Sequence, residues 1–298
     1  MDDKQLVTNI QSENANVRFA AWRAAGDASP AVIPQLGKIM GTASPGISKA
    51  ARESLTTMVH SVGKDPSAPN RDGVANGLLA LTAAGYELPV RIHAFRLLSG
   101  IAPESMAPAI AKSLALPDVQ EEAAYCLERI PGDAPNREFL AAYKNVKDDF
   151  KPRLLYALGH RRAANAVNLC LEAMQSSDER IAMAATKAYG RVGTKGASAP
   201  RFPDPAKLTQ WDRVEEMDSQ LRFADAQAAA GNHAEAIRIY KAALERPEEH
   251  WQCAGIVGLA KLRTSEAAVV IYPKLKSDNS RVRITAENAW KSMAVSAA

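Results

Sequence analysis

The 298-residue chain has few aromatic residues, few cysteines and no long apolar run. Aromatic residues make up 6% of the sequence, and no segment alternates convincingly between apolar and polar residues, which disfavours a β fold. A membrane-spanning helix is excluded because no stretch of about 18 apolar residues occurs. The N-terminus shows no basic region followed by an apolar stretch, so on the sequence as given we expect a soluble, cytoplasmic protein.

The cysteines and histidines show no pattern of a metal site. Cys126, Cys170 and Cys253 stand far apart, each in an apolar helical pattern, and are predicted to be small buried hydrophobic residues. His250 lies three residues before Cys253, but a structural zinc site needs four ligands and no second His/Cys pair lies near them. We therefore predict no metal and no cofactor.

Charge of one sign and catalytic motifs are scarce as well. The chain has 37 basic and 33 acidic residues, a net charge of +4 that suits an acidic partner but falls short of the footprint of nucleic-acid binders. No Gly-rich phosphate loop, Gly-x-Ser-x-Gly elbow or zinc-protease helix motif occurs. We expect a protein that is not an enzyme, although residues distant in sequence can still meet as a triad.

A repeat fills most of the chain. Eight segments align, beginning at Val17, Ile47, Val90, Val119, Phe150, Ile181, Trp251 and Val282. Successive starts are 30, 43, 29, 31, 31, 70 and 31 residues apart. Four residues after the starts stand Ala21, Ala51, Ala94, Ala123, Leu154, Ala185, Gly255 and Ala286. Eight residues after them stand Ala25, Leu55, Leu98, Leu127, Leu158, Tyr189, Leu259 and Trp290. These positions share one helix face, where small residues let a neighbouring helix approach closely.

Each aligned helix is followed by a short break and a second apolar helix, as over residues 29–40, 103–116, 136–146, 163–174 and 265–275. One such pair cannot bury its own apolar face and has to stack on its neighbours. The predicted fold class is therefore all-α, a right-handed superhelix of about eight to nine stacked helix pairs.

Three aligned segments open with the same dipeptide, Val17-Arg18, Val90-Arg91 and Val282-Arg283, while the other five depart from it. The pattern resembles the short bacterial HEAT repeat, also found in phycobilisome-lyase proteins, whose first helix reads Val-Arg, a small-residue pair and a Leu. This resemblance implies a HEAT-like solenoid and is not specific to any activity. A lyase-like or chaperone role toward a chromophore protein rests on the resemblance alone.

The two long spacings indicate insertions. Residues 63–70 form a polar stretch that predicts a lengthened turn inside one pair, and residues 194–205 are too rich in Pro for a helix. Residues 231–244 are similar to the TPR motif in their Gly, Ala, Tyr, Ala and Leu positions, although Gln227 replaces the usual aromatic residue before them. We predict HEAT-like repeats over 1–193, a Pro-rich linker loop over 194–210, and over 211–298 a TPR-like pair followed by HEAT-like repeats continuous with the first solenoid.

In solenoids of this type the second helices line the concave face and offer an extended binding surface. The candidate partner-binding residues on these helices are Gln35, Lys38, Lys112, Arg137, Tyr143, Lys144 and Asn168. Lys38, Lys112 and Lys144 come from separate repeats and predict a basic stripe for an acidic peptide or polyanion, or else an ordinary solvated face.

The densest basic spot follows the fifth aligned helix, where His160 precedes Arg161 and Arg162. Guanidinium groups recognise carboxylates and phosphates through a planar fork of donors, so Arg161 and Arg162 are further candidates for partner binding. The other interpretation is a turn whose cations interact with the last carbonyls of the preceding helix.

The sequence predicts a non-catalytic scaffold or adaptor that binds a protein or peptide on its concave face. The alternative is a nucleic-acid-binding protein like the HEAT-type DNA-repair glycosylases, in which Trp22 and Trp290 would serve an altered base instead of packing. A di-iron hydroxylase of this architecture needs repeated His-Glu dipeptides, and none of the 5 histidines is followed by Glu, which argues against that activity.

Overall fold

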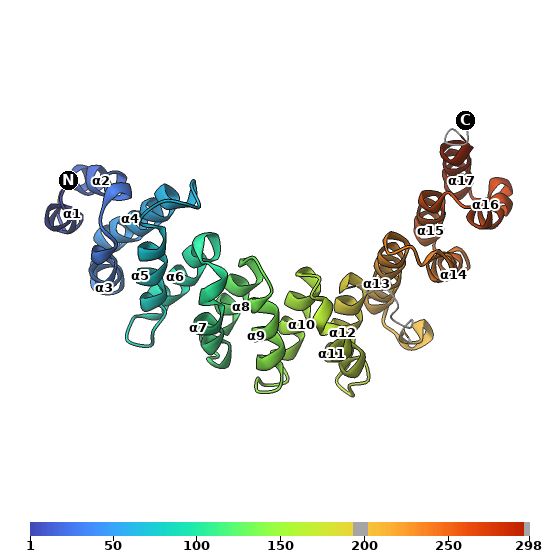
Figure 1. Ribbon diagram of the computed structural model, residues 1–298, viewed down its shortest axis with the longest axis horizontal. Coiled ribbons are helices and arrows are strands. Elements are labelled where there is room, and N and C mark those ends of the chain that lie inside the picture. Colours follow the sequence, from blue (N-terminus) through green and yellow to red (C-terminus); the bar gives the residue numbers. More distant parts are fainter. Residues whose placement is uncertain (193–201, 295–298) are drawn as a thin grey trace. The chain divides into compact units, whose positions relative to one another are not determined.

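A computed structural model describes residues 1–192 and 202–294. Within these ranges the chain forms seventeen α-helices, several short 3₁₀ turns and no strand (Figure 1). The predicted all-α solenoid is confirmed. No helix in the described ranges has both the length and the apolar character needed to cross a bilayer.

The chain divides into two compact units, Met1–Val146 and Lys147–Ala298. The helices of the first unit are α1 (Asp3–Ile10), α2 (Ala15–Arg23), α3 (Ile33–Thr42), α4 (Pro45–Gly63), α5 (Arg71–Leu81), α6 (Leu88–Ile101), α7 (Ala107–Ala111), α8 (Gln120–Arg129) and α9 (Ala134–Tyr143). Those of the second unit are α10 (Lys151–His160), α11 (Val167–Ala173), α12 (Glu179–Val192), α13 (Gln210–Ala229), α14 (His233–Leu244), α15 (Glu249–Leu262), α16 (Ser265–Ile271) and α17 (Ser280–Ala294).

The eight aligned segments coincide with α2, α4, α6, α8, α10, α12, α15 and α17. All eight residues at the small position are buried, from Ala21 in the first segment to Ala286 in the last. At the position four residues later the side chains are buried as well, except that Trp290 is 37% exposed and contacts the Tyr272 ring. The repeat register therefore predicted the packing face, and Trp290 at its end is the exception.

Each unit has two layers of helices. In the first unit α2, α4, α6 and α8 pack on one another in sequence, while α3, α5, α7 and α9 form the other layer (Figure 1). In the second unit α10 packs on α12, α12 on α13, α13 on α15 and α15 on α17, and the helices α11, α14 and α16 complete the pairs. We call α2, α4, α6, α8, α10, α12, α13, α15 and α17 the first-helix layer of their respective units.

The arginine of the Val-Arg dipeptide closes the loop before its helix. Arg18 donates from Nη1 to the carbonyls of Ser12 (2.7 Å) and Glu13 (2.9 Å). Arg91 donates from Nε to the Thr82 carbonyl (3.1 Å) and also pairs with Asp118. Arg283 repeats the arrangement, donating from Nη1 to the Ser277 carbonyl at 2.6 Å. These bonds tie the loop before each helix to the side of that helix.

The pair predicted to be TPR-like corresponds to α13 and α14, which stack between α12 and α15. Gly231 between them has φ +81°, a conformation that favours glycine. Gln227, where the motif usually has an aromatic residue, is fully buried, and its side-chain oxygen accepts a hydrogen bond from Asn232 at 2.9 Å. The polar substitution is thus compensated by a local hydrogen bond.

Of the two predicted insertions, the structure describes the first in full and the second in part. Residues 64–70 lie between α4 and α5 as a lengthened turn, as predicted. Of the predicted linker 194–210, residues 194–201 lie outside the described residues, and Pro205–Lys207 forms a 3₁₀ turn. Thr209 then caps α13 by accepting from the Asp212 amide at 3.1 Å, which fixes where that helix begins.

Candidate functional site

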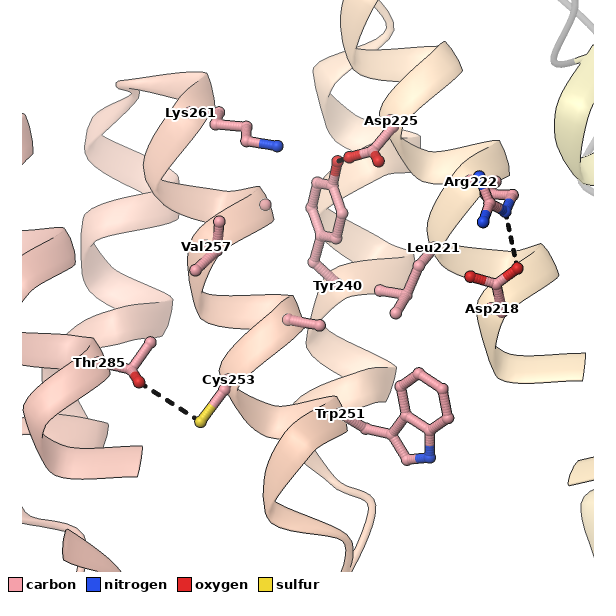
Figure 2. A pocket seen from close by; sticks show the side chains of 12 residues that line it. Asp218, Leu221, Arg222, Asp225, Tyr240, Trp251, Cys253, Val257, Lys261 and Thr285 are labelled. Atoms are coloured by element: carbon pink, nitrogen blue, oxygen red, sulfur yellow. Dashed lines mark hydrogen bonds and ion pairs between the residues drawn. The ribbon is translucent and has the colours of Figure 1, made fainter. Parts of the chain in front are cut away.

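The first-helix layer of the second unit has a groove along α15. Its larger part, about 520 Å³, lies between α13 and α15, with Tyr240 of α14 and Thr285 of α17 completing the lining (Figure 2). The apolar lining consists of Leu221, Trp251, Ala254, Val257 and Gly258. The polar lining consists of Asp218, Arg222, Asp225, Tyr240, Cys253, Lys261 and Thr285.

A second hollow of about 390 Å³ continues the first between α15 and α17. The two share Val257, Lys261 and Thr285, so they form one continuous depression, which we call the α15 groove. The continuation adds the polar side chains of Arg263, Asn288 and Ser292 to the lining.

One wall of the α15 groove depends on a close contact between Gly258 and Tyr240. A Cβ atom on Gly258 would overlap the Tyr240 ring, so the glycine lets the ring lie flat against α15. The buried Tyr240 hydroxyl donates to Asp225 Oδ1 at 2.6 Å, and burial together with this carboxylate raises the pKa of Tyr240. Asp225 is thereby held at the edge of the groove, as Figure 2 shows.

The charges around the groove are only partly compensated. Arg222 pairs with Asp218 at 2.7 Å on the α13 wall. On the α15 side, Lys261 and Arg263 are exposed, and neither has an ion-pair partner among the described residues. Figure 2 shows the Lys261 ammonium reaching across the opening toward α13. The rim therefore carries these two cations and the Asp225 carboxylate of α13, which accepts from Tyr240 and has no ion-pair partner among the described residues either.

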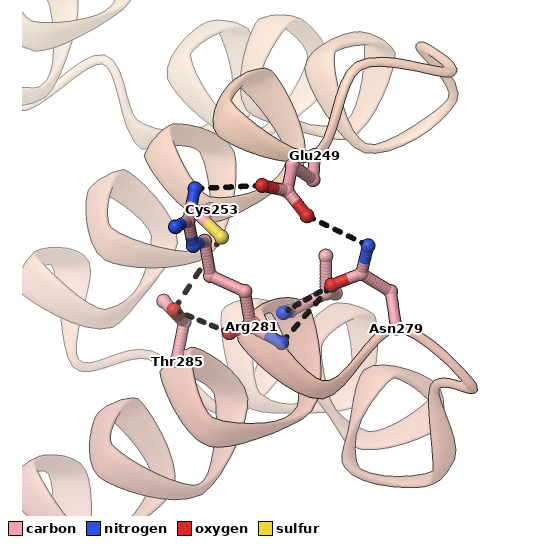
Figure 3. Close-up of polar contacts among 6 residues, drawn as sticks. Glu249, Cys253, Asn279, Arg281 and Thr285 are labelled. Atoms are coloured by element: carbon pink, nitrogen blue, oxygen red, sulfur yellow. Dashed lines mark hydrogen bonds and ion pairs between the residues drawn. The ribbon is translucent and has the colours of Figure 1, made fainter.

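A polar cluster near the groove fixes α17 on α15 (Figure 3). Glu249 accepts from Arg281 at 2.6 Å and from Asn279 at 2.8 Å. Asn279 in turn caps α17 by accepting from the amides of Arg281 and Val282. These bonds join the N-terminal ends of α15 and α17.

A separate depression of about 240 Å³ lies between α10 and α12. It is lined by Tyr156, His160, Lys187, Ala188 and Arg191, and we call it the α12 hollow. Lys187 pairs with Glu215 of α13 at 2.6 Å and lies 5.4 Å from the centre of the Tyr156 ring. The α12 hollow shares no lining residue with the α15 groove.

The three cysteines follow the sequence expectation in part. Cys126 and Cys170 are fully buried, which raises the pKa of both thiols to about 12. Cys253 corrects the prediction, because it is only half-buried, lines the α15 groove and accepts a hydrogen bond from Thr285 at 3.4 Å. In the part of the chain that the structure describes, His, Cys, Asp and Glu form no group of three suited to a metal ion.

Six of the nine residues predicted for partner binding lie in the first unit, all outside its first-helix layer. Gln35 and Lys38 are exposed on one face of α3. Lys112 and Lys144 are exposed at the C-terminal ends of the packed helices α7 and α9, while α5 separates α3 from α7 (Figure 1). Arg137 is exposed on α9 and Tyr143 is half-buried at its end.

The remaining three lie in the second unit. Arg161 is half-buried directly after α10, and Arg162 is exposed with a left-handed φ of 50°. Asn168 is exposed on α11. No described hollow includes any of the nine, and their role in binding stays a prediction.

The repeat register contains a signal for the hollows that the sequence interpretation missed. Val257 and Lys261 stand six and ten residues after the aligned start at Trp251. The same two offsets give Tyr156 and His160 in α10, and Lys187 and Arg191 in α12. Six and ten residues fall on one face of a helix, next to the packing face. The predicted binding residues lay on the second helices and the turn after α10, so these positions of the first helices were not among the candidates.

Comparison with known proteins supports the architecture and assigns no activity. No family model matches the chain, and no characterised protein matches it in sequence. Among solved structures it is similar to a mutant of Kap121p, a HEAT-repeat karyopherin, with a TM-score of 0.52, 11% identity, and coverage of 97% of this chain and 41% of that chain. The chain therefore spans less than half the length of that karyopherin.

Two further structures match at lower TM-scores. An engineered protein has a TM-score of 0.46 and 18% identity, covering 99% of this chain and 89% of that chain. Human deoxyhypusine hydroxylase in complex with glycerol has a TM-score of 0.40 and 13% identity, covering 76% of this chain and 97% of that chain. The similarity to Kap121p, together with the helices of the described residues, shows an all-α helical solenoid.

Proposed function

We propose that this protein is a non-catalytic scaffold that holds an extended segment of a partner polypeptide in the α15 groove. The observation that carries the proposal is an apolar strip on α15, bordered by cations that have no ion-pair partner among the described residues. Stacked helix pairs commonly bind partner chains along such exposed surfaces.

The apolar strip supports a polypeptide as the ligand. Val257 is 45% exposed at the centre of the groove, and Leu221 and Trp251 border it with half-buried side chains. Covering aliphatic and aromatic surface of this kind is favourable, at about 25 cal/mol per Å². Apolar side chains gathered in an open groove therefore favour apolar side chains of a partner.

The polar border suits the main chain of an extended segment. The Asn288 side chain offers both a donor and an acceptor, which match a peptide carbonyl and amide, and Ser292 lies on the same helix. Lys261 adds a cation for a peptide carbonyl or carboxylate. Since the groove continues from α13 to α17 and its lining is partly exposed, it suits a chain that passes along it better than a small molecule enclosed in a pocket.

A displayed library of random dodecapeptides, selected on the whole protein, tests the proposal. We expect enriched peptides to lose at least about tenfold in affinity, or 1.4 kcal/mol, for Val257→Glu, because a charge would occupy the apolar strip. The matched control is Val269→Glu on α16, where the side chain is 72% exposed and outside the groove.

Two results would count against a peptide groove. Either no peptide is enriched above background, or the enriched peptides bind the Val257→Glu and Val269→Glu proteins equally well. A third variant with charge reversal at Lys38, Lys112 and Lys144 addresses the predicted basic stripe of the first unit. If the enriched peptides lose affinity only for that variant, the binding surface lies on the first unit instead of in the α15 groove.

A further inference from the structure

The α12 hollow is a second candidate site, separate from the α15 groove. It lies between α10 and α12 and presents Tyr156, His160, Lys187 and Arg191 around Ala188. Gly159 lies so close to Ala188 that a Cβ atom on the glycine would come within 2.8 Å of the Ala188 Cα atom. The helices α10 and α12 therefore approach closely beside Ala188, the small residue among the polar and aromatic side chains of the lining.

The fixed charges of the hollow leave an excess of one positive charge. Lys187 and Arg191 are cationic, while Glu215 supplies one carboxylate that pairs with Lys187 at 2.6 Å. Arg191 is half-buried and has no carboxylate partner among the described residues. A half-buried guanidinium beside a hollow favours a ligand that supplies the missing negative charge.

The size and charge of the hollow select among anions. About 240 Å³ accommodates a small group such as a carboxylate with its neighbouring methylenes. A singly charged carboxylate balances the excess, whereas a doubly charged phosphate would bring a second negative charge close to Glu215. The Tyr156 hydroxyl can add a hydrogen bond to the same oxygens.

We propose that the α12 hollow is a carboxylate subsite that binds an Asp or Glu side chain of an acidic peptide through Arg191 and Lys187. Arg191 presents its fork of N–H donors to the two carboxylate oxygens, and Tyr156 donates its hydroxyl to one of them. This subsite does not depend on the α15 groove, because the two have no lining residue in common.

Fluorescence anisotropy of labelled hexaglutamate, titrated with the whole protein at low salt, tests the subsite. Arg191→Gln is expected to weaken binding about tenfold or more, and Tyr156→Phe to weaken it by a smaller factor. The matched control is Lys241→Gln, which removes the same charge from an exposed position on α14 and is expected to change affinity less than about twofold.

Several outcomes would overturn the inference. Hexaglutamate that does not bind the wild-type protein rules out the subsite, and equal losses in Arg191→Gln and Lys241→Gln would indicate general attraction to a basic protein. Competition of phosphate and acetate with hexaglutamate, at constant ionic strength, shows which anion the hollow prefers. Displacement of hexaglutamate by inorganic phosphate at concentrations far below those needed for acetate would assign the hollow to phosphoryl groups instead. A loss of hexaglutamate binding in Arg191→Gln, with library peptides still dependent on Val257, would confirm two independent sites.

Discussion

Gly190 of α12 lies against the backbone of Ser219 of α13, so close that a Cβ atom on Gly190 would collide with the Ser219 carbonyl oxygen and lie 3.0 Å from its Cα atom. Beside this contact Tyr189 stacks on Phe223, with ring centroids 5.1 Å apart. The pair α13 and α14 therefore joins the preceding repeat through direct backbone contact, and the first-helix layer continues from α12 into α13.

Gly190→Ala is expected to destabilise the second unit by about 1–3 kcal/mol, because the obstructing atom belongs to a helix backbone that cannot move aside. Gly100→Ala is the control, since nothing lies within 4 Å of a Cβ atom at that helical position. At position 100 the better helix propensity of Ala should stabilise the protein by up to about 1 kcal/mol. Urea denaturation followed by circular dichroism measures both, and an unchanged Gly190→Ala protein would contradict the close packing.

Arg91→Lys is expected to destabilise the first unit by about 1–2 kcal/mol. The Arg91 side chain is buried and contacts the Thr82 carbonyl and Asp118 at once, which a lysine ammonium cannot do with the same geometry. Arg96→Lys on the same helix is the control, because the Arg96 side chain is 64% exposed. Its free energy of unfolding should change by no more than about 0.5 kcal/mol. Equal midpoints for the two variants in a denaturant titration would refute the loop-closing role of Arg91.

Glu216 predicts a pH effect on stability. Its carboxyl is fully buried on α13, bonded to Gln220 and, at 3.0 Å, to Arg246, and burial raises its pKa above the ordinary 4.5. A raised folded-state pKa means that folding favours the protonated form, so its contribution is present at low pH and is lost as pH rises through the folded pKa. We expect the wild-type protein to gain stability relative to Glu216→Gln as pH falls from 7.5 toward 5.

The measurement is the free energy of unfolding of both proteins in urea across this pH range. The difference between them isolates Glu216 from the other carboxyl groups, such as Asp178, whose pKa of about 2 places its own titration well below the range. A difference that is constant or that shrinks as pH falls would show that the ion pair with Arg246 outweighs burial.

The three cysteines are expected to differ in reactivity toward a thiol reagent. Cys253 is half-buried in the α15 groove, whereas Cys126 and Cys170 are fully buried with pKa values raised to about 12. Since the thiolate is the reactive form, one thiol should react in the native protein and three after unfolding. Cys253→Ser should abolish the native reaction, and a remaining native signal would place another thiol at the surface. A peptide held in the groove should slow the labelling of Cys253.

Several elements of the fold could be predicted from the sequence because their signals are local. The spacing of small and apolar residues located eight helices, including α12 around Ala185 and α15 around Gly255, since one helix face is set by a period of 3.6 residues. The lengthened turn after α4 could be predicted from its Pro and polar residues. Cys126 and Cys170 were placed correctly by the same periodicity, whereas Cys253 was not, because its position on the helix faces a groove.

The candidate sites required the tertiary structure. Lys187 and Glu215 belong to different helices, and no spacing rule indicates that they pair, with Tyr156 of a third helix beside them. Likewise Tyr240 of α14 lines the depression beside Val257 because Gly258 of α15 leaves room for its ring, which no spacing in the sequence indicates.

The sequence by itself determined that this protein is a stack of α-helices and which face of each aligned helix is packed, because periodic apolar and small residues act within one or two turns of a helix. The tertiary structure alone decided which outer-face residues line a hollow. Neighbouring helices come within contact distance at only a few places, such as Gly190 and Ser219, and those contacts set which exposed side chains of α10, α12, α13, α15 and α17 lie next to one another.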